Sequence, residues 1–154
     1  MRRSTATMGI LALSGGLLLG CGSSKKSDAS GGVTVGSTVA GAPVSVTAGD
    51  KSDTEQFFTV DPASVKAGAV TFTFKNTGTR QHEMIVLKTD EAFDQLKVGT
   101  DNKVSEDKSA GEVSETDAGK TVVKTLDLAA GKYVLICNLE KHYGQGMRAA
   151  FTVG

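Results

Sequence analysis

The sequence contains few aromatic residues and few of the soft side chains that bind metals. Its 154 residues include no Trp, two Cys, two His and two Pro, and aromatic residues make up only 5%. Neither charge dominates, because 17 basic side chains face 17 acidic ones, whereas a nucleic-acid binder needs a clustered basic surface. We therefore expect one domain of ordinary size and no nucleic-acid partner. With so few soft ligands, any metal site must use nearly all of them.

The first 20 residues have the pattern of an export signal. A short basic start, Met1-Arg2-Arg3, precedes an apolar stretch from Met8 to Leu19. A membrane-spanning helix needs about 20 apolar residues, and this stretch is shorter than that and rich in glycine. Residues 1–20 are therefore predicted to be a signal peptide, followed by a flexible tether over residues 21–42 and one domain over residues 43–154.

The end of the apolar stretch, Leu18-Leu19-Gly20-Cys21, resembles the lipobox of bacterial lipoproteins. The resemblance implies that Cys21 is lipidated and begins the mature chain, which anchors the protein on the extracytoplasmic face of the membrane, at the cell surface or in the periplasm. The alternatives are an ordinary signal peptide with a chance Cys21, or a disulfide between Cys21 and Cys137. Lipidation of Cys21 would forbid that disulfide.

From Pro43 onward the hydrophobic pattern is that of short β-strands. Val70, Phe72 and Phe74 alternate with polar residues, whereas residues 133–137 are apolar on both faces, as in a central strand. The pattern predicts an all-β sandwich of about seven or eight strands. Strands are expected at residues 43–47, 56–60, 70–74, 84–87, 121–128, 133–137 and 149–153.

Residues 90–117 interrupt this pattern and are called the acidic excursion below. They contain nine acidic residues and three lysines. Asp90 to Val98, with Phe93 and Leu96 as apolar points, is expected to form one short helix. The rest is expected to be solvated chain, so the sandwich carries one acidic, partly helical excursion.

Both histidines, the only internal Cys of the mature chain and one Met fall into a single arrangement. His82 follows the turn after the strand at 70–74, and a Cys-x4-His-x4-Met segment places Cys137, His142 and Met147 on one loop. A thiolate favours Cu(I), whereas imidazole suits both oxidation states of copper. Two His and one Cys in a plane, with a long axial Met, are the ligands of blue-copper electron-transfer sites.

With these residues the chain resembles the cupredoxins. Residues 60–68, residues 70–84 and residues 131–147 carry the likeness, which extends over about residues 43–154. The loop spacing is closest to that of rusticyanin and sulfocyanin. The resemblance implies a Greek-key β-sandwich with one type 1 copper. Its equatorial ligands are then His82, Cys137 and His142, and its axial ligand is Met147.

One departure concerns Glu83, because azurin-like members place an Asn after the first ligand His, where its amide braces the Cys loop. Glu83 puts that bracing in doubt.

The resemblance implies a single-electron carrier whose partners are redox proteins such as a cytochrome or a terminal oxidase. The alternative is a lipoprotein for copper delivery or tolerance, although such proteins usually have Met-rich and His-rich open sites. An enzyme is not expected, because copper oxidases need further histidines for their catalytic coppers, and both histidines here belong to one site.

Overall fold

The computed structural model describes residues 41–154, which form nine β-strands and contain no helix. The predicted signal peptide, Cys21 and nearly all of the predicted tether lie outside the described residues. Within residues 41–154, no helix has the length and apolar character that crossing a membrane requires. The strands are β1 (Ala42–Ser52), β2 (Glu55–Asp61), β3 (Ser64–Val65), β4 (Gly68–Asn76), β5 (His82–Lys88), β6 (Ser109–Thr116), β7 (Thr121–Leu128), β8 (Gly131–Ile136) and β9 (Arg148–Val153).

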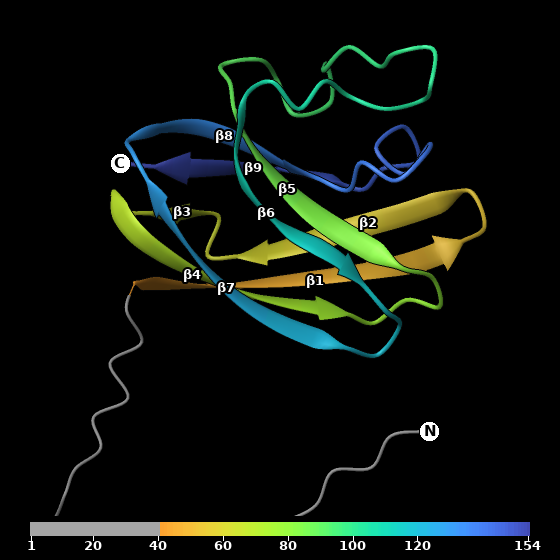
Figure 1. Ribbon diagram of the computed structural model, residues 1–154, viewed down its shortest axis with the longest axis horizontal. Coiled ribbons are helices and arrows are strands. Elements are labelled where there is room, and N and C mark those ends of the chain that lie inside the picture. Colours follow the sequence, from red (N-terminus) through yellow and green to blue (C-terminus); the bar gives the residue numbers. More distant parts are fainter. Residues whose placement is uncertain (1–40) are drawn as a thin grey trace, which may run out of the picture. The chain divides into compact units, whose positions relative to one another are not determined.

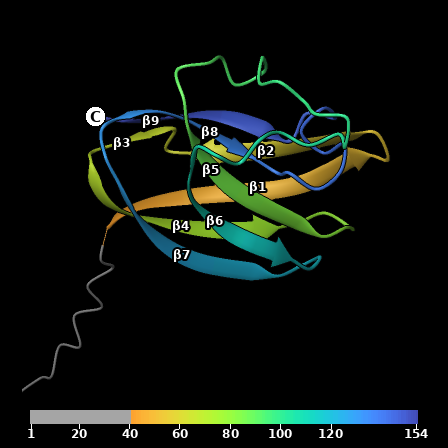
Figure 2. The ribbon, with the colours of Figure 1, turned by 45° about the horizontal axis from the view of Figure 1, so that its top comes forward.

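The strands form two sheets that pack face to face, as Figures 1 and 2 show. One sheet has the order β2-β1-β4-β7, and the other has the order β3-β9-β8-β5-β6. Most neighbours are antiparallel, but β1 pairs with β4 in parallel and β3 pairs with β9 in parallel. The predicted all-β sandwich is confirmed. It has nine strands, whereas about seven or eight were predicted.

Side-chain alternation explains why these segments form strands. In β4, Val70, Phe72 and Phe74 are buried, while Thr73 and Lys75 face solvent. Strand β8 is buried from Tyr133 to Ile136 because it lies between β9 and β5 and is covered on both faces. The predicted central position of this strand is therefore correct.

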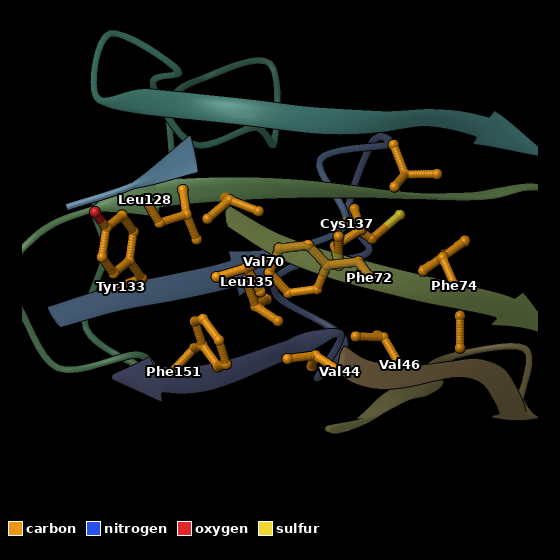
Figure 3. Close-up of a cluster of buried hydrophobic side chains, with 14 of the residues drawn as sticks. Val44, Val46, Val70, Phe72, Phe74, Leu128, Tyr133, Leu135, Cys137 and Phe151 are labelled. Carbon is orange, nitrogen blue, oxygen red and sulfur yellow. The ribbon is translucent and has the colours of Figure 1, made fainter. Parts of the chain in front are cut away.

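The main core lies between the two sheets. The ring of Phe72 packs against that of Phe151, with 5.6 Å between their centroids, and Phe58 meets Phe74 edge-on at 6.1 Å. Figure 3 shows Cys137 in the same cluster as these side chains, at the end of the row formed by Tyr133 and Leu135. The core thus extends to the end of the sandwich where Cys137 lies.

The predicted short helix at residues 90–98 is wrong. Residues 89–108 consist of turns and one isolated bridge between Val98 and Val104. The amide of Leu96 donates to the hydroxyl of Tyr143 at 2.9 Å instead of to a carbonyl one turn upstream. Short helices are marginal on their own, and of the two apolar points only Leu96 is buried, whereas Phe93 is 41% exposed.

The second half of the acidic excursion is not simply solvated chain, because it contains β6. This strand forms the edge of the second sheet and pairs with β5. Only Val113 and Thr116 are buried in it. A strand with so few apolar residues gives no alternating pattern, so the sequence did not reveal it.

Candidate metal centre

The predicted ligands come from one end of the second sheet. His82 is the first residue of β5, and Cys137 directly follows β8. These two strands are antiparallel neighbours, with Ile85 opposite Ile136, so the start of one lies beside the end of the other. His142 and Met147 lie on the loop from β8 to β9, which returns to the same end of the sandwich.

Three of the four predicted ligands converge. The Nδ1 atoms of His82 and His142 lie 3.3 Å apart, and the Cys137 Sγ lies 3.3 Å from the His142 Nδ1. The potential ligand atoms of these three residues all fall within 4.8 Å of one another. His82 and Cys137 are fully buried, and His142 is 9% exposed. The three form the metal-ligating cluster found within residues 41–154.

Met147, the fourth predicted ligand, is fully buried and belongs to the same core cluster as Cys137. The amide of Cys137 donates to the Met147 carbonyl at 3.1 Å, and the amide of Met147 donates to the His142 carbonyl at 3.0 Å. The backbone of Met147 therefore lies beside that of Cys137.

The loop that carries His142 is tightly turned. The amide of His142 donates to the Leu139 carbonyl at 3.0 Å, and that of Gln145 donates to the Lys141 carbonyl at 2.9 Å. Gly146 has a φ of 106°, and a Cβ at this position would come within 2.8 Å of the Gln56 carbonyl oxygen. Glycine therefore allows the loop to close against β2.

Burial controls the protonation of the metal-free site. It raises the pKa of the Cys137 thiol to about 12. It also lowers the pKa of His82, which Asp50 partly opposes, and the pKa of His142, which His82 lowers further. Near neutral pH the site thus presents two neutral imidazoles and a thiol, so metal binding must displace the thiol proton.

The spacing of these donors suits a copper ion. Bonds of about 2.0–2.1 Å from a first-row metal to two imidazole nitrogens put those nitrogens about 3.5 Å apart in a trigonal plane. The 3.3 Å between the Nδ1 atoms of His82 and His142 is close to this value. Two imidazoles and one thiol are also donor types that suit copper, whereas hard cations such as Mg²⁺ and Ca²⁺ prefer oxygen donors.

Asp50, which the sequence did not single out, lies behind the His82 ring. Its Oδ1 is 3.0 Å from the His82 Nε2, without the alignment of a full hydrogen bond. Burial by itself would raise the pKa of Asp50, but hydrogen bonds from Thr79 and the charge of His82 lower it overall. No sequence pattern links Asp50 to His82, because the two residues lie on different strands of different sheets.

Glu83 does brace the Cys loop, so the doubt raised by its departure from the azurin pattern is resolved. Its Oε1 accepts the amide of Asn138, the residue after Cys137, at 3.0 Å. The Asn138 side chain in turn binds both backbone groups of Val104, at 2.8 and 2.9 Å, and donates to Glu106 at 2.7 Å. These contacts tie the metal loop to the acidic excursion.

Tyr143 makes a second tie to the excursion. Its buried hydroxyl accepts the Leu96 amide at 2.9 Å and donates to the Phe93 carbonyl at 3.0 Å. The guanidinium of Arg148 lies 5.0 Å from the centre of the Tyr143 ring. Contacts of Tyr143 with the acidic excursion and with Arg148 therefore hold the loop that carries His142.

Solved structures with a similar fold include auracyanin and rusticyanin. Auracyanin from the photosynthetic bacterium Roseiflexus castenholzii is 23% identical, with a TM-score of 0.52 over 74% of this chain and 99% of that chain. Rusticyanin from Thiobacillus ferrooxidans is 19% identical, with a TM-score of 0.56 over 74% of this chain and 79% of that chain. At such identities the similarity shows the fold. A search of curated proteins found no match.

A β-sandwich that buries two imidazoles and a thiol together at one end defines the single-copper, type 1 class of proteins. Residues 44–154 match the family of copper binding proteins described as the plastocyanin/azurin family. The chain belongs to this family. The predicted cupredoxin resemblance is thus confirmed, and the protein is a copper-binding electron carrier with one type 1 copper.

Proposed function

We propose that this cupredoxin carries single electrons on the extracytoplasmic side of a membrane, held there by a lipid on Cys21. Its partners would be redox proteins such as a cytochrome or a terminal oxidase. The observation that carries the proposal is the convergence of three buried donors within 4.8 Å. His82, Cys137 and His142 would be the equatorial ligands and Met147 the axial one. When bound, copper supplies the one-electron couple.

Hydrogen bonds and packing hold each donor in place. Backbone turns fix His142, a hydrogen bond from the Cys137 amide to Met147 closes the loop, and Glu83 braces the residue after Cys137. Ligands that cannot relax toward the geometry preferred by either oxidation state change little when an electron arrives or leaves. A small rearrangement favours fast electron transfer.

His142 is the best route for the electron to the surface. It is 9% exposed, whereas His82 and Cys137 are fully buried. The exposed pair Glu140 and Lys141 precedes it in the loop, and the two side chains form an ion pair at 3.3 Å. A partner that docks over His142 would therefore meet a polar rim of both charges.

Electron carriage without catalysis fits the histidine content. A catalytic copper centre beside a type 1 site needs further histidines, and the sequence has only the two that converge here. We therefore propose no enzymatic activity for the chain by itself.

Copper loading of the purified chain tests the proposal. We expect one copper per chain, an intense visible absorption from the Cu(II)–thiolate pair, and rapid, reversible reduction by a small redox protein. An open copper-delivery site would give weak absorption and readily lose Cu(I) to a chelator. Zinc without colour after exposure to Cu(II) would contradict the proposal outright.

The lipid anchor has its own test. The full-length chain with Cys21→Ser, expressed in a bacterium that processes lipoproteins, is expected to keep its leader and to incorporate no labelled fatty acid. The unaltered chain is expected to be labelled and to sediment with membranes, because two or more acyl chains give stable anchoring. Mass spectrometry that finds mature chains with unmodified Cys21 would exclude the anchor.

A further inference from the structure

The outer nitrogen of His82, which faces away from the other donors, meets a carboxylate. The His82 Nε2 lies 3.0 Å from the Asp50 Oδ1, while its Nδ1 lies 3.3 Å from the His142 Nδ1. The side chain of His82 is fully buried, and that of Asp50 is 9% exposed. A buried imidazole nitrogen next to a carboxylate oxygen carries the proton, since two lone pairs would repel.

The turn between β4 and β5 holds this carboxylate in place. The Asp50 Oδ2 accepts the amide of Thr79 at 2.7 Å, its hydroxyl at 3.2 Å, and the amide of Arg80 at 3.3 Å. These three donors occupy Oδ2 and leave Oδ1 beside the His82 Nε2. Asp50 is thus oriented by the backbone, independently of the metal.

Gly78 allows the same turn to cover the pair. A Cβ on Gly78 would lie 2.5 Å from the Asp50 Oδ2 and 2.9 Å from the His82 Nε2. No larger residue fits without moving one of the two groups. The close approach of the turn leaves little room for water beside the contact, so the charge of Asp50 acts on His82 with little screening.

We propose that Asp50 is a positioning residue of the copper site. By keeping the proton on the His82 Nε2, Asp50 leaves the Nδ1 lone pair free to bind copper, and its negative charge favours Cu(II) over Cu(I). The reduction potential is therefore lower than it would be with a neutral group at this position. This inference rests on the proposed function for the copper couple, but the tautomer of His82 does not depend on it.

Asp50→Asn is the informative variant, because the amide oxygen can still accept from Thr79 and Arg80 while the amide NH2 faces His82. A donor at that position favours the tautomer with the proton on Nδ1, which competes with copper. We expect affinity for Cu(II) to fall about 10–100-fold, as for other partners of ligand histidines, and the reduction potential of the copper-loaded variant to rise. Asp53→Asn is the matched control: it removes the same charge from a neighbouring side chain that is 96% exposed and pairs with Arg80 instead of His82.

The tautomer of His82 is measured by nitrogen-15 NMR on the metal-free full chain, and the potential by redox titration of the copper-loaded chain. In the unaltered chain, the proton of His82 is expected on Nε2, a result that requires no variant to fold. A proton on Nδ1 there, or a copper-loaded Asp50→Asn chain with the potential of the Asp53→Asn control, overturns the inference. A chain that binds no copper overturns the proposed function while the NMR result still decides the role of Asp50.

Discussion

Replacing Cys137 by serine is expected to abolish the intense visible absorption of the copper-loaded protein. The absorption requires a thiolate bound to Cu(II), and Cys137 is the thiol within the cluster with His82 and His142. Serine is nearly the same size, so the buried position remains filled and the sandwich is expected to stay folded. Absorption spectra after loading with Cu(II), together with circular dichroism, give the two readouts.

Met147→Gln is the matched control for Cys137→Ser, since both residues are fully buried and their backbones are hydrogen-bonded to each other. It is expected to keep the thiolate absorption, because the axial ligand contributes little to that band. It is also expected to lower the reduction potential, because an oxygen donor stabilises Cu(II) more than a weak thioether contact does. A band that survives in Cys137→Ser, or disappears in Met147→Gln while copper stays bound, would contradict the ligand assignment.

Phe72→Ala is expected to lower the free energy of unfolding by about 3–5 kcal/mol. Phe72 is fully buried between the sheets, and its ring packs against Phe151, so truncation removes apolar contacts and leaves a cavity. Domains of this kind are typically stable by about 5–15 kcal/mol, which makes this loss a large part of the total. Urea unfolding of the metal-free chain, followed by circular dichroism, measures the change.

The control for this variant is Thr73→Ala, the next residue of β4, which is exposed. It is expected to change the free energy of unfolding by no more than about 0.5 kcal/mol. Similar losses in the two variants would mean that the stability of β4 depends on strand propensity and not on the core.

The strands that could be predicted have either one apolar side chain in two, as in β4, or an unbroken apolar run, as in β8. Val70, Phe72 and Phe74 revealed β4 because one face of the strand is buried and the other faces solvent. Strand β6 could not be predicted, since an edge strand with only Val113 and Thr116 buried has no such contrast. The helix predicted at residues 90–98 failed because Tyr143, distant in sequence, binds the backbone groups that a helix would use.

The site divides in the same way. His82, Cys137 and His142 could be proposed from the sequence because they are rare residue types with an interpretable spacing, and the structure brings them together. Asp50 could not, because the chain has many carboxylates and only the packing of β1 against the turn after β4 selects this one. A residue such as Asp50, which affects the metal site only through its contact with His82, is identified from the structure and not from its residue type.

The position of β9 determines when the copper site can form during folding. This strand follows all others in chain order, yet it lies between β3 and β8 in the second sheet. Its pairing with β3 joins Val65 to Val153, a contact between distant parts of the chain that forms slowly because of the loop it must close. His142 and Met147 lie on the loop between β8 and β9, so we expect docking of β9 to complete their approach to His82. We therefore expect copper capture by the complete donor set to be a late event in folding.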